Sequence, residues 1–499
     1  MIPVVTTSQM TKAELNSEKN GITRVRLMQN AANAILDFLE SRFTISGKSA
    51  IIIAGSGNNG GDGAVLSKLL GKKGVKTALI APNGLPNTET SKTCLEKTNG
   101  TLPPILSEKA ENAFNGADII IDCVFGTGFH GELPENIAEL FKTANLSKAV
   151  KISVDIPSGV NGNTGVIAPH SFRPDITLVL AAMKTGLLNL PCADYCGEAV
   201  ILDIGITDDC YNEYDGLFTD ESIKKLFPRR PKFSNKGTFG KLLNISGCNK
   251  YIGAAVLSSK AALRTGAGLV CLASVPKVTG IAAAAVPECV FKELKENGEG
   301  YIRHCEIEKI APEISGFSAA AFGCGVGNTE EAQKTADFLL KNVKSTLIID
   351  ADGINAVSAN INVLKDKSGA VVMTPHPGEF ARLTGTSVSW VQSHRIEAAR
   401  DFAFEYDTVL LLKGANTIVA APDGRVMVNT TGNSALAKAG CGDVLAGIIG
   451  ALAAQGVKPF EAAVLGAYLH GEAADFLVKE QAAASVLASE VADALGKII

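Results

Sequence analysis

The chain has 499 residues, of which 46% are hydrophobic and 20% are charged, and its formal net charge is −4. This length exceeds one ordinary hydrophobic core and predicts two domains, while the composition excludes a disordered or fibrous chain. The small net charge, without blocks of like charge, argues against a nucleic-acid or membrane-surface partner. We therefore expect small molecules as partners.

The cysteine pattern and the amino terminus indicate a reducing setting. The 11 cysteines lack paired C-x-x-C spacing, and the nearest two, Cys192 and Cys196, have no second pair to complete a zinc site. We expect free, buried thiols and a cytoplasmic location. Residues 1–21 contain no basic segment followed by an apolar core, which predicts no signal peptide, and no run reaches the roughly 18 apolar residues of a membrane span.

The first part of the chain is predicted to form a doubly wound α/β domain. Residues 8–42 show the apolar spacing of one helix face. Beyond them, short apolar runs alternate with helix-like segments, which is typical of a parallel sheet covered by helices on both faces. These runs are "SAIIIAG", "VKTALIAP", "ADIIIDCVFG", "AVKISVDIPSG" and "DITLVLAA".

The domain boundary is predicted near residue 215. Residues 207–237 interrupt the alternation with acidic, aromatic, proline and basic residues. The alternation then resumes, so we expect an α/β domain over 1–215 and another over 216–499. The later runs are "GKLLNISG", "AALRTGAGLVCLASV", "SAAAFGCGVG", "STLIIDADG", "AVVMTPHPGEF", "DTVLLLKGANTIVAA" and "GDVLAGIIGALAAQG".

Polar residues follow several strands of the first domain where a ligand would bind, beyond the carboxyl ends of parallel strands. The segments are "GNNGGDG", Asp122 with "CVFGTGFHG", and "SVDIPSGVNG", which contains Asp155, Ser158 and Asn161. Each alone is also explained by turns and helix caps. Together they predict one cleft rich in oxygen atoms, suited to a hard cation and a phosphate-bearing ligand.

Gly55, Gly57 and Gly60 form a G-x-G-x-x-G, but the match to a dinucleotide-cofactor loop is weak. Such a loop is normally followed, about 20 positions later, by an acidic residue that holds the ribose. Here the second strand ends in "LIAPNGLPN", which has no acidic residue.

The segments "LMQNAAN", "AGSGNNGGDG", "DCVFGTGF" and "DIPSGVNG", in this order, resemble the NAD(P)H-hydrate epimerase family over nearly all of the first half, although Ala32 stands where the family usually has Gly. The resemblance implies a Rossmann-like three-layer domain that binds a damaged dinucleotide as substrate, with the glycines allowing close backbone approach. It implies a potassium ion at Asn59, Asp122 and Ser158. The implied substrate residues are Asn58, Asn59, Gly60, Gly61, Asp62, Gly126, Thr127, Gly128, Phe129, His130, Gly131, Glu132 and Asp155.

Asp155 is our choice for the acid/base group of this site. Inversion at C6 of the hydrated nicotinamide ring needs one such group beside the carbon, because the ring nitrogen can assist the loss of hydroxide. The alternative is a turn residue before "IPSG".

The strongest local signal of the second half is "NTTGNSALAKAGCGDVLAGIIGALAAQG". Its glycine-rich turn leads through Asp443 into an apolar helix, whose first amides favour an anion. An acidic residue there is a poor phosphate ligand but is well placed to take a proton from a hydroxyl that attacks phosphorus. The alternative is that Asp443 is a plain helix N-cap.

Further polar residues of this half end predicted strands. "LLLKGANTIVAAPDGR" predicts two strands joined by a turn against which a nucleotide could lie. "TPHPGEF" places His376 and Glu379 between and after stiffening prolines, and we expect His376 in the ligand site. Asp350 and Asp352 could contact a hydrated magnesium ion or cap the next helix.

The segments "SNKGTFGKLLNISG", "GAAVLSSKAALRTGAGLV", "FGCGVGN", "DADGIN", "TPHPGEF", "LKGANT" and "GCGDVLAGIIG" resemble the ribokinase-like, nucleotide-dependent NAD(P)H-hydrate dehydratases from about residue 228 to the end. Two positions depart from that family, Cys441 for Ser or Thr and Asn235 for His. The resemblance implies ADP with a magnesium ion as the phosphate donor. The implied residues are Ala254, Gly325, His376 and Asp443 for the hydrated dinucleotide, and Lys413, Gly414, Ala415, Asn416, Thr417 and Gly442 for the nucleotide.

The two resemblances together imply a fused metabolite-repair enzyme. The second half would phosphorylate the C6 hydroxyl of the S-hydrate and release phosphate, restoring NADH or NADPH and leaving AMP. The first half would interconvert the R- and S-hydrates. One alternative is a small-molecule kinase with a regulatory nucleotide-binding module, and another makes the first half a scaffold. We expect a homo-oligomer.

Overall fold

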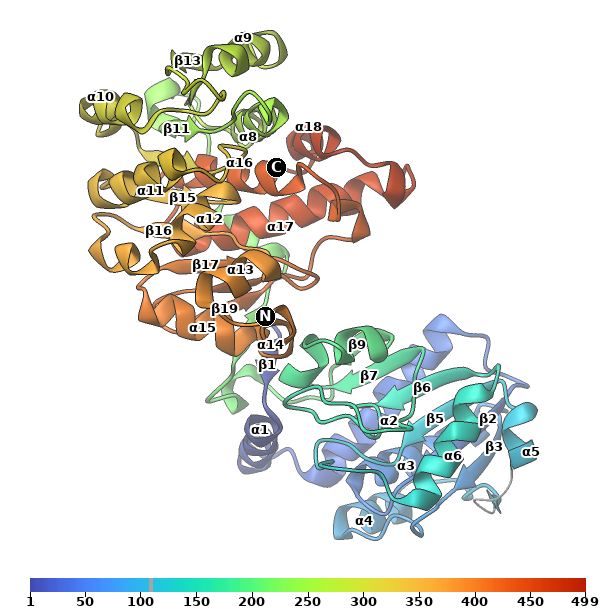
Figure 1. Cartoon of the computed structure of the whole chain (residues 1–499). Coiled ribbons are helices and arrows are strands. Elements are labelled where there is room, and N and C mark those ends of the chain that lie inside the picture. The colour runs from blue at the N-terminus through green and yellow to red at the C-terminus, as the bar shows by residue number, and fades with distance from the viewer. Residues whose placement is uncertain (107–110) are drawn as a thin grey trace. The chain divides into compact units, whose positions relative to one another are not determined.

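The computed structural model describes residues 1–106 and 111–499, which divide into two compact units, Ile2–Gly216 and Leu217–Ile499 (Figure 1). We call these the N-terminal unit and the C-terminal unit and describe each by itself. Both are built on largely parallel sheets flanked by helices, so the predicted α/β class is confirmed.

The sheet of the N-terminal unit is parallel throughout, in the order β4-β3-β2-β5-β6-β7-β9. The chain runs outward from β2 in one direction and resumes beside β2 in the other, which makes the carboxyl ends of β2 and β5 a topological switch point. The strands are β2 (Ser49–Ala54), β3 (Lys76–Ile80), β4 (Ile105–Leu106), β5 (Ile119–Cys123), β6 (Val150–Val154), β7 (Ile176–Leu180) and β9 (Glu198–Leu202), with a separate parallel pair of β1 (Pro3–Val5) and β8 (Met183–Lys184).

Helices cover both faces of this sheet. Ile52 lies in the core formed with α2, α3 and α4, while its neighbours Ile51 and Ile53 lie in the core formed with α5 and α6. Because side chains alternate along a strand, a run of isoleucines fills both cores, as predicted for a three-layer domain. The helices are α1 (Thr7–Lys19), α2 (Arg24–Arg42), α3 (Asn58–Lys72), α4 (Glu89–Lys97), α5 (Glu111–Asn115), α6 (Glu135–Leu146) and α7 (Cys192–Tyr195), with the 3-10 helices η1 (Thr185–Leu188) and η2 (Asp208–Cys210).

The helical pattern predicted over 8–42 forms two helices. Helix α1 ends before Asn20, Gly21 has φ +92°, and the Thr23 side chain caps the start of α2. A left-handed glycine followed by a capping threonine stops one helix and starts the next, which the apolar spacing alone does not reveal.

The sheet of the C-terminal unit runs in the order β13-β12-β11-β14-β15-β16-β17-β18-β19-β10. It is parallel from β13 to β17, and β18 is antiparallel to both its neighbours. The strands are β10 (Gly216–Phe218), β11 (Lys241–Ile245), β12 (Leu269–Ser274), β13 (Val290–Glu293), β14 (Ala319–Phe322), β15 (Thr346–Ile349), β16 (Val371–Met373), β17 (Val409–Leu412), β18 (Ile418–Ala420) and β19 (Val426–Val428).

One face of this sheet packs against α8, α16, α17 and α18 in a core rich in alanine. Gly447 of α16 lies so close to α8 that a Cβ there would stand 2.1 Å from the Ser258 carbonyl oxygen. The helices are α8 (Ile252–Arg264), α9 (Pro276–Ala285), α10 (His304–Ile314), α11 (Glu330–Asn342), α12 (Asp352–Ser358), α13 (Pro377–Thr384), α14 (Val388–Ser393), α15 (Arg395–Glu405), α16 (Cys441–Ala454), α17 (Pro459–Leu477) and α18 (Ala488–Ile498), with the 3-10 helices η3 (Glu221–Leu226), η4 (Lys236–Phe239), η5 (Ile361–Asp366), η6 (Ser434–Leu436) and η7 (Ala483–Ser485).

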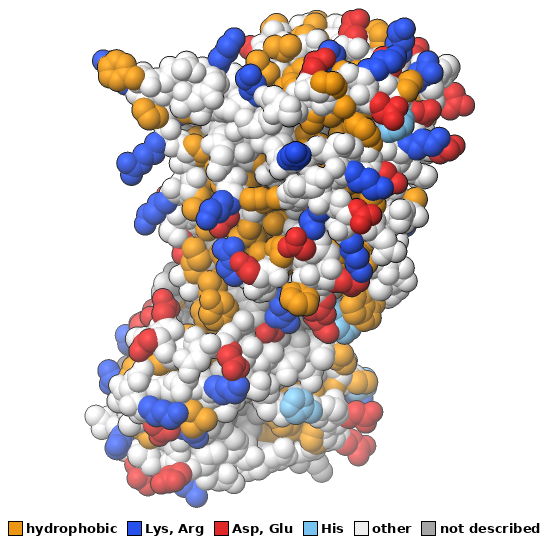
Figure 2. Space-filling view, turned by 90° about the vertical axis from the view of Figure 1, so that its left-hand side faces the viewer, with side chains coloured by type: hydrophobic (Ala, Val, Ile, Leu, Met, Phe, Trp, Pro, Cys, Tyr) orange, Lys and Arg blue, Asp and Glu red, His pale blue; other side chains and the backbone are white. Residues whose placement is uncertain are grey.

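The surface and the thiols agree with the composition. On the face drawn in Figure 2, basic and acidic side chains are interspersed. Within the described ranges, no helix has the length and apolar character needed to cross a bilayer. All 11 cysteines are free, and all but the half-buried Cys305 are buried, as expected.

Candidate active sites

The carboxyl ends of β5 and β6 in the N-terminal unit meet around one buried carboxylate. Asp122 is 0% exposed, and its Oδ1 accepts hydrogen bonds from the Val124 amide at 3.1 Å and the Ser158 hydroxyl at 2.6 Å. Its Oδ2 accepts from the Ser158 amide at 2.8 Å and the Ser153 hydroxyl at 3.0 Å. Burial raises the pKa of Asp122 to about 6, and these hydrogen bonds oppose the rise. The structure thus brings Asp122 and Ser158 together, as the sequence predicts.

Asn59, in the first turn of α3, leaves a buried acceptor without a donor. Its Nδ2 donates to the carbonyl oxygen of Val154 at 3.3 Å, at the end of β6, while its Oδ1 is buried and has no hydrogen-bond partner in the part of the chain that the structure describes. A buried oxygen without a donor is costly unless a donor or a cation satisfies it. Oxygen atoms of this kind are what a hard cation prefers, so these residues fit the ion that the sequence predicts.

Asp155 has a constrained backbone and one engaged carboxylate oxygen. Its φ is +68°, and its Oδ1 accepts from the Leu180 amide at 3.2 Å and forms an ion pair with Lys184. Lys184 is 1% exposed, and its ammonium also donates to the Leu180 carbonyl oxygen at 2.8 Å. Asp155 Oδ2 accepts no hydrogen bond in the described part of the chain and lies 3.5 Å from the position of a Cβ on Gly126. A backbone strained at a residue with a free carboxylate oxygen is typical of a functional position.

Two residues that the sequence analysis missed complete this cluster. One is Lys184, which lies in an apolar stretch, "AAMKTG", without a recognisable motif. The other is Glu14 of α1, whose pKa is raised by burial and then by the charge of Asp155. The pKa of Asp62 is also raised, by burial first and then by Asp155 and Glu14. The charges of Glu14, Asp62 and Asp155 therefore lie close enough to interact. The sequence does not reveal this cluster, because no motif spacing connects α1 with the later strands.

The glycines of the first loop serve internal packing more than the sequence suggests. A Cβ on Gly55 would stand 2.1 Å from the Val124 carbonyl oxygen, and one on Gly60 would stand 1.8 Å from the Gly55 carbonyl oxygen. Only Gly57 of the three has open space around it. Gly55 is therefore required where the ends of β2 and β5 approach each other, and Gly60 where the first turn of α3 approaches the end of β2.

The other predicted substrate residues surround the same strand ends. Phe129 is buried against Phe125, with ring centroids 5.3 Å apart, and the His130 ring lies 3.1 Å from the Asn161 amide nitrogen. Asn58 is exposed and accepts from the Thr88 hydroxyl at 2.6 Å. Of the remaining predicted residues, Gly61 is buried, Thr127 is half-buried, and Gly128, Gly131 and Glu132 are exposed.

In the C-terminal unit, the predicted residues follow the carboxyl ends of neighbouring parallel strands. Asp350 follows β15, and its Oδ1 accepts from the Lys413 ammonium, after β17, and from the Thr374 hydroxyl, after β16, both at 2.7 Å. Cys324, after β14, contacts Asp350 Oδ2 at 3.8 Å. Ligand atoms of Cys324, Asp350 and Asp443 lie within 4.8 Å of one another.

Asp443 is part of this cluster and does not cap its helix. The N-cap of α16 is Gly440, with φ +92°, and Asp443 lies within the first turn. Burial raises the pKa of Asp443 to about 6, the charge of Asp350 adds to the rise, and Cys324 and Lys413 oppose it. A carboxyl group with such a pKa can exchange a proton near neutral pH. The N-cap alternative for Asp443 is therefore wrong.

The first turn of α16 offers free donors beside a cation. Within residues 1–106 and 111–499, the amides of Gly442 and Asp443 have no acceptor. A Cβ on Gly442 would stand 3.3 Å from the Lys413 ammonium nitrogen. Free amides at a helix start next to an ammonium group favour an anion.

The remaining predicted residues lie around this cluster or cap a helix. Gly325 follows Cys324, and its Cβ would stand 2.8 Å from the Cβ of Ala254 on α8. His376 caps α13, since its Nδ1 accepts from the Gly378 amide at 3.0 Å, but its ring remains half exposed. Asp352 accepts from the Gly327 amide at 2.8 Å and does not cap α12, whose N-cap is Ala351.

The structure explains why the departures from the family patterns are tolerated. Ala32 is fully buried within the α2 core, and Asn235 caps η4 by accepting from the Gly237 amide at 2.8 Å. Cys441 is buried at the first position of α16.

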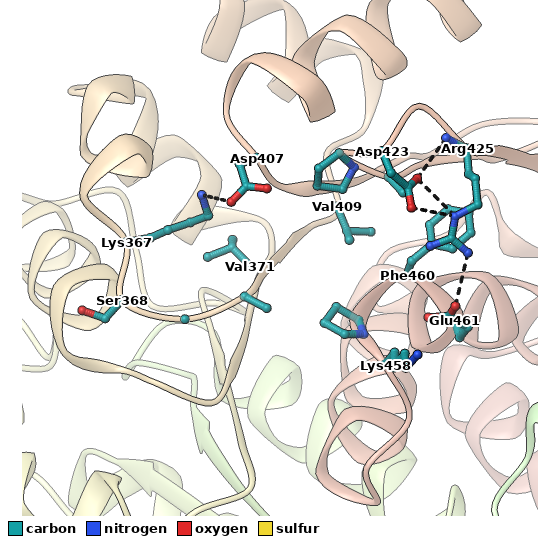
Figure 3. A pocket seen from close by; sticks show the side chains of 15 residues that line it. Lys367, Ser368, Val371, Asp407, Val409, Asp423, Arg425, Lys458, Phe460 and Glu461 are labelled. Carbon is teal, nitrogen blue, oxygen red and sulfur yellow. Dashed lines mark hydrogen bonds and ion pairs between the residues drawn. The ribbon is translucent and has the colours of Figure 1, made fainter.

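A cavity of about 550 Å³ lies at the other edge of the C-terminal sheet (Figure 3). It is lined by residues at the amino ends of β16 and β17, among them Val371 and Val409, and by the start of α17. Arg425 there pairs with Asp423 at 2.9 Å and with Glu461 at 3.3 Å. No predicted site residue lines this cavity, so it is separate from the cluster around Asp443.

Comparison with known proteins supports the same division of the chain. Residues 24–186 match the family model of the YjeF-related protein N-terminus, and residues 242–497 match that of NAD(P)H-hydrate dehydratase. The bifunctional NAD(P)H-hydrate repair enzyme Nnr of Moorella thermoacetica is 35% identical, over 99% of this chain and 96% of its own length.

Solved structures match the C-terminal part of the chain. A hypothetical protein from Streptococcus mutans has a TM-score of 0.50 and 27% identity, covering 56% of this chain and 98% of its own. The ADP/ATP-dependent NAD(P)H-hydrate dehydratase of Bacillus subtilis, crystallised with ATP and Mg²⁺, has a TM-score of 0.49 and 32% identity, covering 57% and 97%.

Proposed function

Since the chain belongs to the family of bifunctional NAD(P)H-hydrate repair enzymes, we propose which of its two units catalyses each reaction and which residues perform each step. The chain is an NAD(P)H-hydrate epimerase and dehydratase, and the activity expected from the sequence is confirmed at this level. The family favours repair over the alternative of a small-molecule kinase. We assign epimerisation to residues 1–215 and dehydration to residues 216–499.

In the N-terminal unit, Asp155 acts as the acid/base group at C6 of the hydrated ring. Its Oδ1 is engaged by Lys184 and by the Leu180 amide, while its Oδ2 has no hydrogen-bond partner among the described residues and lies near Gly126. A carboxylate held by one oxygen is oriented, and the other oxygen can move a proton. Residues 58–62 and 126–132 surround Asp155 and hold the dinucleotide.

Asn59, Asp122 and Ser158 would hold a potassium ion at this site. The ion would satisfy Asn59 Oδ1, which has no hydrogen-bond partner among the described residues, while the buried carboxylate of Asp122, which already accepts four hydrogen bonds, would supply the negative charge. When bound, the ion supplies a positive charge that compensates Asp122 and favours an anionic ligand at the strand ends. The protein side chains alone perform the proton transfer.

In the C-terminal unit, Asp443 acts as the base toward the C6 hydroxyl of the S-hydrate. As Asp443 takes the proton, the hydroxyl oxygen attacks the terminal phosphorus of ADP and the bond to AMP breaks. The free amides of Gly442 and Asp443 and the Lys413 ammonium face the charge that develops on phosphate. The ring nitrogen then expels phosphate from C6, and loss of a proton from C5 to solvent forms the C5–C6 double bond, which restores NADH or NADPH.

The other predicted residues bind the two ligands of this unit. Ala254, Gly325 and His376 contact the hydrated dinucleotide, and the turn Lys413–Thr417 with Gly442 contacts ADP. Asp350 and Asp352 would hold a magnesium ion through its water shell. It would offset the charge of the ADP phosphates.

The observation that carries this proposal is the juxtaposition of Asp443, Asp350 and Lys413 at free helix amides. The S-hydrate with ADP and Mg²⁺ is expected to give NADH, AMP and phosphate in equal amounts. Asp443→Asn is expected to bind ADP but to form no AMP. A stable phosphorylated dinucleotide, or full activity of Asp443→Asn, would contradict the mechanism.

A further inference from the structure

Arg395, the first residue of α15, is a buried cation without an acidic partner in the described residues. It is 3% exposed. Burial lowers the pKa of its guanidinium to about 10, and no neighbouring charge contributes to the shift. Burying a charge without a counter-charge costs free energy of folding unless other polar groups compensate it. The polar contacts of the Arg395 guanidinium therefore indicate its function.

The partners of this guanidinium are mainly backbone carbonyl oxygens of one turn. Helix α15 packs against β17 and β18 (Figure 1), which the turn Lys413–Thr417 connects. Arg395 donates to the carbonyl oxygens of Leu412 at 3.5 Å, Lys413 at 3.5 Å and Asn416 at 3.4 Å. Its one shorter hydrogen bond goes to Gln392 Oε1 at 3.0 Å. The carbonyl contacts are at the long limit for hydrogen bonds and leave the charge only partly compensated.

These contacts orient the peptide groups of the turn. In a trans peptide the carbonyl and the following amide point in opposite directions. The Lys413 and Asn416 carbonyls face Arg395, so the Gly414 and Thr417 amides face away from it. The amides of Gly414, Ala415 and Asn416 have no acceptor within the described ranges, and all three residues are exposed.

The turn can lie against the guanidinium only with glycine at its second position. Gly414 has φ +147°, and a Cβ there would stand 2.7 Å from an Arg395 guanidinium nitrogen. Asn416 also has a positive φ, +54°. The backbone is therefore held in a shape that turns the Lys413 and Asn416 carbonyls toward a cation and the Gly414 and Thr417 amides away from it, while the Gly414 carbonyl accepts from the Thr417 hydroxyl at 2.9 Å.

We propose that Arg395 is a positioning residue that orients the Lys413–Thr417 turn and gives its outer side the positive potential that holds a nucleotide phosphate. The proposal rests on the assignment of this turn to ADP, and it adds which part of the nucleotide the turn holds. Free amides in front of a buried cation attract an anion and give no advantage to a neutral base.

The test compares charged and uncharged ligands on the full chain. Calorimetry with Mg²⁺ and without dinucleotide measures the binding of ADP, AMP and adenosine to the wild type, Arg395→Gln and Arg395→Lys. Arg395→Gln is expected to weaken ADP and AMP by about 10-fold, equal to about 1.4 kcal/mol, and to leave adenosine within about 2-fold. Arg395→Lys keeps the positive charge but lacks the planar guanidinium, and its affinity for ADP and AMP is expected to lie between those of the wild type and Arg395→Gln. Arg425→Gln, at the opposite sheet edge, is the matched control and should bind all ligands as the wild type does.

The outcomes separate this inference from the proposed function. Unchanged ADP affinity in Arg395→Gln, or equal losses for ADP and adenosine, would overturn the role in phosphate binding. If Arg395→Gln does not fold, as judged by thermal unfolding, the ratio of ADP to adenosine affinity in Arg395→Lys decides: a lowered ratio supports the role and an unchanged ratio overturns it. If the wild type binds ADP yet regenerates no NADH, the proposed function fails while the binding comparison still stands.

Discussion

Lys184 binds one carboxylate oxygen of Asp155 and leaves the other oxygen without a partner among the described residues. Lys184 is fully buried, and its second bond to the Leu180 carbonyl fixes the direction of its side chain. This relationship divides the carboxylate into an anchored oxygen and an oxygen available to substrate. It is the physical basis on which we propose that the N-terminal unit performs the epimerisation.

Substitution of Asp155 should abolish epimerisation without affecting dehydration. Asp155→Asn keeps the size of the side chain but cannot accept a proton, so we expect the rate of R-to-S interconversion to fall roughly 10²- to 10⁴-fold. The readout is separation of the two hydrates by chromatography. Dehydration of pure S-hydrate by the same variant is the internal control and should be unchanged.

Lys184 should also be required for the stability of this site. Lys184→Met leaves Asp155 buried without its cation, which typically costs about 3–5 kcal/mol. We expect a lower melting temperature of the N-terminal unit together with slower epimerisation. Lys48→Met, which removes an exposed ion pair with Asp118, is the matched control, because such pairs contribute at most about 1 kcal/mol. Equal effects of the two variants would contradict the role of Lys184.

Potassium should stabilise the N-terminal unit through Asp122. A ligand that binds only the folded state raises stability with its concentration, so KCl should raise the melting temperature more than LiCl at equal ionic strength. Asp122→Asn removes the negative charge while retaining an oxygen, and its melting temperature should not distinguish the two salts. Ser153→Ala removes only the hydroxyl that donates to Asp122 Oδ2 and should retain the difference.

Dehydration should depend on the ionisation of Asp443. Its pKa is raised from 3.8 to about 6, so the base is deprotonated above that pH and is progressively lost below it. We therefore expect kcat/KM for the S-hydrate to fall tenfold for each pH unit below about 6. Asp443→Glu should retain some activity, with a shifted dependence of kcat/KM on pH. A rate independent of pH between 5 and 7 would exclude Asp443 as the base.

The contact between α8 and α16 should tolerate no side chain at Gly447. Gly447→Ala would place a Cβ 2.1 Å from the Ser258 carbonyl oxygen, so the helices must separate. Such overpacking usually costs about 1–3 kcal/mol, which thermal unfolding would detect. Gly253→Ala is the matched control on α8, because its Cβ would meet nothing within 4 Å, and it should be neutral or slightly stabilising.

The sequence predicted the strand-end chemistry well because parallel strands bring their carboxyl ends together. Asp122, at the end of β5, contacts Ser158, which follows the neighbouring strand β6. Asp350 and Lys413 follow β15 and β17, the two strands that flank β16, and their side chains are also in contact. Arg395 was not predicted, because its function depends on which carbonyl oxygens surround it, and the sequence contains no pattern for that.

Other differences arise from local geometry that the sequence pattern does not encode. Glu14 approaches Asp155 from α1, whose separation from α2 depends on Gly21. The sequence leaves an N-cap as the alternative for Asp443, and the position of Gly440 as the N-cap of α16 excludes it. The sequence predicts that Gly55 and Gly60 allow a ligand to approach the backbone, and the structure adds that each also has to be glycine because a Cβ would meet a neighbouring carbonyl group.

The most direct test of the account is the conversion of pure R-hydrate of NADH by the full chain with ADP and Mg²⁺. The central claim is that Asp155 and Asp443, on separate units of one chain, act in succession. We expect the wild type to convert all of the R-hydrate to NADH, with one AMP and one phosphate formed for each NADH. Asp155→Asn should regenerate NADH only at the slow rate of spontaneous epimerisation. An equimolar mixture of Asp155→Asn and Asp443→Asn should recover activity. A wild type that leaves the R-hydrate unconverted, or a mixture that remains as slow as Asp155→Asn alone, would contradict the account.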